Sequence, residues 1–356
     1  MQSSVHLVGS IPMSDCETVF RAMASQLGPW LRRLPDGETG ERGKWIYWQR
    51  EMLLSHPDME IDPDSELLPI YQWDGKLIRE TELLRFRSGV EPRTVRFETG
   101  YEKAALHSYE IFTTLQDEGI IPNNVLFQVS LPTPIASGYM YVSPTSIEDY
   151  LPIYETALLD ALNIILDKIP HESLSIQWDV CQEILIFEDY FPYRPIDYKD
   201  RIFQQLGRLG SEVPSDVDLG FHLCYGTPRN EHLVMPKDTG VLVEMANGVQ
   251  SQLERNIDFF HIPVPADRID DDYYAPLAQL HVKQNTELYL GLIHPRDSEG
   301  DMQRMKAAGK VVEAFGIASE CGWGRTNYDE LPGLIQSHQI AARTSKELLE
   351  FPKDKH

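Results

Sequence analysis

Short apolar segments alternate with longer helical patterns along almost the whole of this 356-residue chain. Eight of the short segments are bounded by turn residues in the manner of strands. They lie at residues 6–10, 31–37, 125–132, 174–180, 218–226, 257–265, 287–295 and 315–322. Helical patterns lie between most of them, most clearly at residues 14–27, 101–118, 146–168, 197–209, 239–255 and 300–314. Strands that alternate with helices in this way form a parallel sheet.

Eight strand–helix units predict an α/β fold of the (β/α)8 TIM barrel type. A chain of this length can form one such barrel. Residues 38–120 are too many for one unit, and they include a tryptophan-rich helical stretch at 45–54. We interpret 38–120 as a segment inserted after the second strand, which could cover the barrel mouth as a lid. The expected organisation is a single domain over residues 1–356 that contains this insertion.

Polar side chains stand at or just past the ends of nearly all the predicted strands. They are Ser10, Asp36 with Glu38, Thr133, Asp179, His222 with Cys224, His261, His294 and Cys321. One polar residue in such a place is unremarkable, but packing alone does not explain a whole series of them. A barrel gathers the carboxyl ends of its strands around one cavity, so the sequence predicts a polar site there.

Three of these residues are of the types that bind zinc. His222 and Cys224 stand two residues apart on one predicted strand, so their side chains point to the same face. Cys321 ends another strand much later in the chain. Three histidine or cysteine ligands leave one zinc position open, where a substrate thiol would be deprotonated to the nucleophilic thiolate. A buried, inert pair of core residues is the alternative interpretation.

The motifs around these residues resemble, in the same order, the catalytic barrel of cobalamin-independent methionine synthase. That family belongs to a superfamily that also includes uroporphyrinogen decarboxylase. The resemblance is carried by VGSIP (8–12), DGETGER (36–42), IQWD (176–179), HLCYG (222–226), GLIHP (291–295) and ECGWGR (320–325). It implies zinc bound by His222, Cys224 and Cys321, and a proton donated by His294.

The resemblance also implies a substrate site. The loop of Ser10 would hold an amino-acid carboxylate, and Glu38 would contact the substrate amine. Asp36 shares the glycine-containing loop with Glu38, and Arg42 would either clamp an anion or neutralise these carboxylates.

Asp179 ends an apolar strand, where a carboxylate needs a partner or a substrate, so we expect it to be catalytic together with His294. Trp178 and Trp323 neighbour the candidate ligands. They either pack in the core, as strand alternation favours, or contact a substrate bulkier and more apolar than homocysteine.

The sequence departs from the family at the fourth zinc ligand. The glutamate that the family carries on the next strand has no counterpart by strand order, and His261 occupies its place. Glu244 is closer in linear spacing, but a helical stripe of apolar residues leaves it on the opposite face of its helix. We therefore expect His261 to be the additional ligand, with Glu244 as the alternative.

Charge and composition exclude several partners. The chain has 55 acidic and 32 basic residues, a net charge of −23, so nucleic acid and polyanionic ligands are not expected. There is no apolar run long enough to span a membrane and no recognisable signal peptide. Four cysteines are too few for a disulfide framework and fit a reducing compartment, which predicts the cytoplasm. The oligomeric state is not predicted.

We therefore expect a zinc-dependent transferase that moves a methyl or larger alkyl group to or from a small-molecule thiol. These 356 residues lack the half by which the long synthases hold polyglutamyl folate, so folate-dependent methionine synthesis is not expected. One alternative is a lyase, isomerase or decarboxylase that uses the same barrel mouth. The other is a non-catalytic protein that binds zinc or a small molecule.

Overall fold

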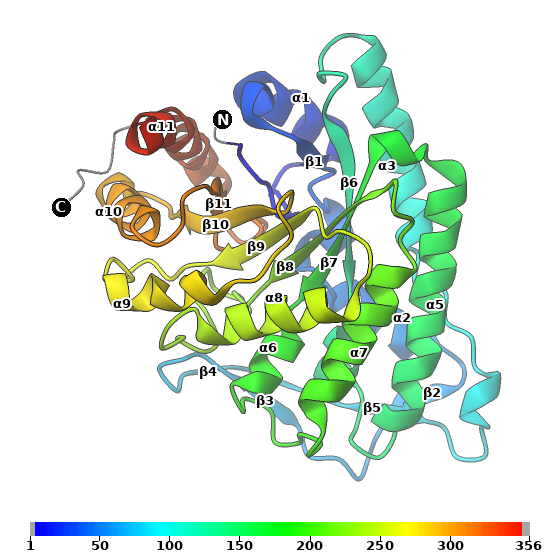
Figure 1. The fold of residues 1–356 in the computed structure, drawn as a ribbon. Helices are drawn as coiled ribbons and strands as arrows, with labels where there is room; N and C mark the ends of the chain where they lie inside the picture. Colours follow the sequence, from blue (N-terminus) through cyan, green and yellow to red (C-terminus); the bar gives the residue numbers. More distant parts are fainter. Residues whose placement is uncertain (1–3, 351–356) are drawn as a thin grey trace.

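The computed structural model describes residues 4–350 and shows a mixed α/β fold around a curled parallel sheet (Figure 1). Residues 1–3 and 351–356 of the expected single domain lie outside this description. Within residues 4–350 the sheet has seven strands in the order β1-β6-β7-β8-β9-β10-β11. They are β1 (Arg33–Pro35), β6 (Leu126–Pro132), β7 (Leu174–Val180), β8 (Asp218–Leu223), β9 (Phe259–Pro263), β10 (Glu287–Ile293) and β11 (Gly316–Ser319).

Seven of the eight predicted strands are therefore confirmed, with ends shifted by a few residues. The strand predicted at 6–10 is not formed. Instead, Val5 makes isolated parallel bridges with both Leu31 and Ile317 and so connects the two outer strands of the sheet. The residues after Val5 leave the ladder, and the Ser10 carbonyl accepts a hydrogen bond from the Trp323 amide at 2.6 Å. The result is a TIM-barrel-like sheet.

Helices cover the outer face of the sheet (Figure 1). The predicted helical patterns correspond to α1 (Cys16–Leu27), α3 (Tyr101–Asp117), α5 (Ile147–Lys168), α7 (Tyr198–Ser211), α8 (Gly240–Gln252) and α10 (Ser298–Gly309). Shorter helices are α4 (Pro134–Tyr141), α6 (Gln182–Phe187) and α9 (Asp271–Tyr274), and α11 (Leu331–Glu350) ends the described chain. Among the described helices, none is both long and apolar enough to cross a bilayer.

Helix α1 illustrates how the sequence sets these elements. The Asp15 side chain accepts a hydrogen bond from the Thr18 amide at 2.7 Å, which caps the first turn. The buried residues Val19, Phe20 and Met23 recur at helical spacing and face the core. Gly28 follows the last turn.

Extra structure separates β1 from α3. It contains α2 (Tyr47–Ser55) and two antiparallel pairs, β2 (Met59–Ile61) with β5 (Leu84–Phe86), and β3 (Leu68–Tyr71) with β4 (Leu77–Thr81). Helix α3 packs against α1, α5 and β6 and so serves as a barrel helix. These elements lie between β1 and α3, whereas α3, which falls within the expected segment 38–120, packs with the sheet and its covering helices.

Strand alternation on β7 determines which side chains face the barrel interior. Gln177 donates a hydrogen bond to the Val8 carbonyl at 2.8 Å, and His6 Nε2 lies 2.9 Å from Gln177 Oε1. Both contacts cross the barrel interior, so Gln177 points inward. Asp179, two residues later, points inward as well, whereas Trp178 between them points toward the surrounding helices.

Candidate metal centre and substrate pocket

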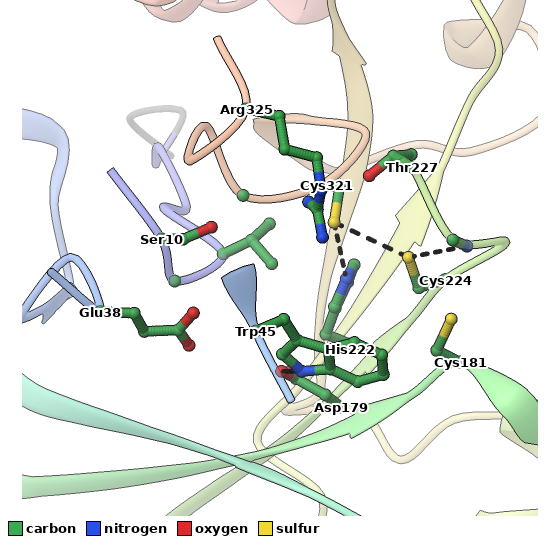
Figure 2. Close-up of a pocket in the computed structure, with 14 residues that line it drawn as sticks. Ser10, Glu38, Trp45, Asp179, Cys181, His222, Cys224, Thr227, Cys321 and Arg325 are labelled. Carbon is green, nitrogen blue, oxygen red and sulfur yellow. Dashed lines mark hydrogen bonds between the residues drawn. The ribbon is translucent and has the colours of Figure 1, made fainter. Parts of the chain in front are cut away.

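His222, Cys224 and Cys321 converge beside the ends of strands of the curled sheet (Figure 2). His222 lies on β8, Cys224 follows that strand directly, and Cys321 follows β11. The sulfur atoms of the two cysteines are 3.7 Å apart, and Cys321 Sγ is 3.7 Å from His222 Nε2. All three potential ligand atoms lie within 4.8 Å of one another. The structure thus brings together three of the four predicted ligands.

These separations fit a tetrahedral ion. Zinc binds sulfur at about 2.3 Å, so two sulfurs on neighbouring corners of a tetrahedron stand about 3.8 Å apart. The measured separation of the two sulfur atoms is 3.7 Å. The donor set of two thiols and one imidazole is also the one that zinc prefers.

His261 fixes the tautomer of His222. His261 Nε2 lies 2.9 Å from the Ser319 carbonyl, which can only accept, so this nitrogen carries the proton. Burial holds the pKa of His261 well below its ordinary value, so its ring is neutral and its Nδ1 must accept. The donor is His222 Nδ1, 2.7 Å away. His222 Nε2 is then the ring nitrogen on the side of the cysteines, 3.7 Å from Cys321 Sγ, where a metal would bind it.

The pKa values of the two thiols are shifted in opposite directions, that of Cys224 upward and that of Cys321 downward. The hydrogen bond with Cys224, helped by His222 and Arg325, holds the pKa of the Cys321 thiol well below its ordinary value. A thiolate is the form that binds a metal. Cys321 is therefore already prepared as a ligand by its surroundings.

The two residues considered for the fourth ligand lie elsewhere. His261 has both ring nitrogens engaged behind His222 and is not one of the three grouped ligands. Glu244 is exposed on α8 and pairs with Lys199 at 2.6 Å. The structure thus places His261 as a support for the ligand His222, and Glu244 away from the centre.

A small pocket of about 40 Å³ opens beside the three ligands (Figure 2). Two carboxylates line it, Asp179 from the end of β7 and Glu38 from the loop after β1. Its other lining residues include Ser10, Trp45, Cys181, Thr227 and Arg325. A cationic or hydrogen-bonding group of a substrate can therefore reach the carboxylates while another part lies at the ligands.

The carboxylates are held in an apolar, enclosed setting. Asp179 accepts hydrogen bonds from Trp45 Nε1 at 3.0 Å and from Gln177 Nε2 at 2.8 Å. Burial raises the pKa of Asp179 to about 6. Burial and the neighbouring charge of Asp179 raise the pKa of Glu38 well above its ordinary value. Both groups can therefore hold a proton in the absence of a cation.

Glu38 reaches the pocket through an unusual backbone. Its φ angle is +47°, in the left-handed region that residues other than glycine rarely adopt. The Glu38 amide donates to Asp36 Oδ1 at 2.9 Å, and Arg42 binds Asp36 Oδ2 at 2.5 Å. Ser108 also donates to Asp36, at 2.7 Å. Asp36 and Arg42 therefore lie behind Glu38 and stabilise its loop rather than lining the pocket.

Ser10 lines the pocket, as expected for a substrate-binding residue. Its hydroxyl accepts a hydrogen bond from the Gly324 amide at 3.3 Å, which ties its loop to the chain after Cys321.

His294 does not line this pocket. Its Nε2 lies 2.8 Å from the Val264 carbonyl, its amide donates to Asp301 at 3.0 Å, and burial lowers its pKa.

The two tryptophans expected near substrate also lie outside the pocket. Trp178 is fully buried on the outward face of β7, because its neighbours Gln177 and Asp179 point inward. The Trp323 ring packs 5.1 Å from the ring of His338, and its Nε1 donates to Ser319 Oγ at 3.0 Å. Both residues therefore pack in the core, the alternative that strand alternation favours.

Several pocket residues were not selected from the sequence as part of the site, among them Trp45, Cys181 and Thr227. Trp45 comes from the start of the tryptophan-rich stretch, Cys181 follows β7, and Thr227 follows the HLCYG motif. For Cys181 and Thr227 a signal was available, since both lie just beyond predicted strands, where barrel sites are built. Trp45 belongs to the tryptophan-rich stretch 45–54 of the expected lid, but nothing in that stretch singled out this residue as a pocket residue.

Comparison with known proteins shows similarity in fold. No family model matches the sequence, and no curated protein matches it. A B12-independent methionine synthase from Shewanella sp. W3-18-1, solved with selenomethionine, has a TM-score of 0.63 at 14% identity, covering 99% of this chain and 100% of that one. A Listeria monocytogenes protein described as a putative vitamin-B12 independent methionine synthase has a TM-score of 0.56 at 14% identity. The alignment covers 99% of this chain and 100% of that one. A methyltransferase from Methanosarcina mazei has a TM-score of 0.56 at 13% identity, and the alignment covers 96% of this chain and 94% of that one. Two of these structural neighbours are thus described as members of the family that the sequence motifs resemble, and the third as a methyltransferase.

Proposed function

We propose that this protein transfers a methyl or larger alkyl group to or from a small-molecule thiol, with zinc bound by His222, Cys224 and Cys321. The observation that carries the proposal is the placement of these three ligands beside a pocket with two buried carboxylates. The likeness of the fold to proteins described as methionine synthases and a methyltransferase supports it. A (β/α)8 barrel with its site at the carboxyl ends of the strands is the architecture we infer.

When bound, zinc supplies the chemistry that lowers the pKa of a substrate thiol, so that the sulfur is present as thiolate at neutral pH. The chemical step then forms a sulfur–carbon bond and breaks the bond between that carbon and its leaving group. The proton lost by the thiol balances the charge on the leaving group. The protein must therefore orient two reactants and move one proton.

Asp179 is the residue best placed to carry that proton. Its carboxyl lies in the pocket, and its pKa of about 6 lets it both hold and release a proton near neutrality. Trp45 donates to Asp179 Oδ2 and so fixes the direction of the carboxyl. His294 receives no proton-transfer role in this scheme, because its Nε2 is engaged with the Val264 carbonyl.

Glu38 and Ser10 would hold the polar end of the substrate. A substrate ammonium beside Glu38 would favour the ionised carboxylate and compensate for its burial. The Ser10 hydroxyl lies on the adjacent loop and can contact a carboxylate of the same substrate. The indole of Trp45 lines the pocket and would limit the access of water to a reactive sulfur there.

The test is a measurement of bound metal followed by a thiol-alkylation assay. We expect about one zinc per purified chain by mass spectrometry, lost in a Cys224→Ser, Cys321→Ser double variant. Cys16→Ser is the matched control, because Cys16 is a buried cysteine on α1 outside the pocket. Zinc-loaded protein should then alkylate a thiol with a methyl, epoxide or allylic donor. Wild-type protein without bound metal, or equal metal in the double variant, would contradict the proposal.

A further inference from the structure

A second, larger cavity adjoins the pocket at the metal centre. Its volume is about 400 Å³, and we call it the outer cavity. It shares five lining residues with the inner pocket, namely Trp45, Cys181, Gly226, Thr227 and Arg325. The two cavities therefore meet at these residues. A molecule in the outer cavity can present one end to the inner pocket.

The wall of the outer cavity is mostly apolar, and part of it comes from the segment between β1 and α3. Ile46, Ile70 and Ile78 from this segment face Met140 of α4 and Leu233 of the loop after β8. Apolar walls of this kind bind the apolar body of a ligand by removing it from water. A compact, fully polar co-substrate would leave this surface wet.

The charges in the outer cavity are of one sign. Lys44, Arg79 and Arg325 line it, and no aspartate or glutamate does within the described residues. This is unexpected in a chain with 55 acidic and 32 basic residues. None of the three cations has a carboxylate partner in the part of the chain that the structure describes. Arg42 and Arg50, on the same segment, are both paired.

We infer that the outer cavity binds the co-substrate of the alkyl transfer as an amphipathic anion, an apolar body that carries one carboxylate, sulfonate or phosphate group. That the ligand is a co-substrate rests on the proposed function, whereas its binding in the outer cavity does not. The cations provide charge-assisted hydrogen bonds to the anionic group, and the isoleucine-rich wall accommodates the body. The end that reacts would lie at the junction, between Trp45 and Arg325, facing the inner pocket.

The test is a binding titration with a probe of this class. The probe is 8-anilinonaphthalene-1-sulfonate, whose fluorescence rises in an apolar site, and its neutral counterpart is N-phenyl-1-naphthylamine. Full-length protein is titrated as wild type, Arg79→Gln and Arg325→Gln. The matched control is Arg93→Gln, an exposed arginine on the same segment that does not line the cavity.

We expect each cavity variant to raise the Kd of the sulfonate about tenfold, as the loss of one charge-assisted hydrogen bond implies. Binding of the neutral probe should change little in these variants and should fall in Ile78→Trp, which fills the cavity. Arg93→Gln should match wild type with both probes. Equal sulfonate binding by wild type, Arg79→Gln and Arg325→Gln would overturn the inference.

The same titration on zinc-loaded protein, run beside the thiol-alkylation assay, separates the two proposals. Arginine-dependent sulfonate binding in protein that never alkylates a thiol would contradict the proposed function and still support an amphipathic anion as the ligand. Thiol alkylation that persists together with arginine-independent probe binding would do the reverse.

Discussion

The Nδ1 atoms of His222 and His261 lie 2.7 Å apart, so one imidazole holds the other in a fixed tautomer. The two residues are register partners on β8 and β9, which explains why their rings meet. Beyond His261, the Ser319 carbonyl completes the chain of hydrogen bonds. The direction of His222 Nε2 toward Cys321 is therefore determined by a residue that is not one of the three grouped side chains.

His261→Ala should weaken zinc binding without abolishing it. Loss of a group that orients a metal ligand typically lowers the affinity about 10- to 100-fold. Removal of the ligand itself in His222→Ala should cost more. Competition with a chromophoric chelator measures both values, and His171→Ala, on the surface beside Asp216, is the control. A loss in His261→Ala as large as that in His222→Ala would instead identify His261 as a ligand.

The sequence was sufficient to predict the strands and three convergent ligands, because both depend on simple periodicity. Strand alternation places His222 and Cys224 on one face, and barrel topology brings Cys321 to them. The sequence could not assign the role of His261, because the same residue type at the end of a strand can face a metal or a neighbouring ring. The pairing of β8 with β9 decides this, and pairing register is a tertiary property.

Trp178 and Trp45 differ in how far the sequence could predict their positions. Alternation with Gln177 and Asp179 directs Trp178 away from the barrel interior, so the periodic pattern already favoured core packing for it. Trp45 reaches Asp179 from an irregular loop before α2, where no period applies. The contact of Trp45 with Asp179 was therefore beyond sequence reasoning, although Glu38, from the same segment between β1 and α3, was selected by its motif.

Gly9→Ala should impair the substrate site while leaving the metal in place. A Cβ atom at position 9 would lie 2.8 Å from Glu38 Oε1 and displace that carboxylate. We expect a fall of about 10- to 100-fold in kcat/KM, the scale of a small misplacement in an active site, with unchanged zinc content. Gly309→Ala is the control, because nothing lies within 4 Å of its added Cβ. Unchanged kcat/KM in Gly9→Ala would argue against a substrate role for Glu38.

Arg33→Met should destabilise the fold strongly. The buried Arg33 guanidinium forms two bonds with Asp218, at 2.5 and 2.6 Å, and one with Glu287 at 2.9 Å. Its loss leaves the partly buried Asp218 carboxylate without its cation, whereas Glu287 keeps its pair with Arg32, and we expect a cost of about 3–5 kcal/mol. The control is Arg201→Met, whose half-exposed pairs contribute less than about 1 kcal/mol. Urea denaturation measures both, and equal losses would contradict the assignment.

Glu183→Gln should stabilise the protein at alkaline pH and have little effect under acidic conditions. Glu183 is fully buried on α6, and burial raises the pKa of its carboxyl to about 7 from the ordinary value of 4.5. Between these two pH values the folded protein retains a proton that the unfolded chain has lost. The free energy of unfolding therefore falls as the pH rises from about 4.5 to 7, by up to about 3 kcal/mol, and remains at the lower value above pH 7.

The glutamine variant cannot ionise and should lack this part of the pH dependence. Urea denaturation of wild type and Glu183→Gln at pH 4.5 and pH 8 isolates the contribution, because every other titrating group is common to both proteins. We expect the stability difference to be small at pH 4.5 and to favour Glu183→Gln by up to about 3 kcal/mol at pH 8. A difference that is the same at both pH values would show that the Glu183 carboxyl ionises as readily in the folded protein as in the unfolded chain.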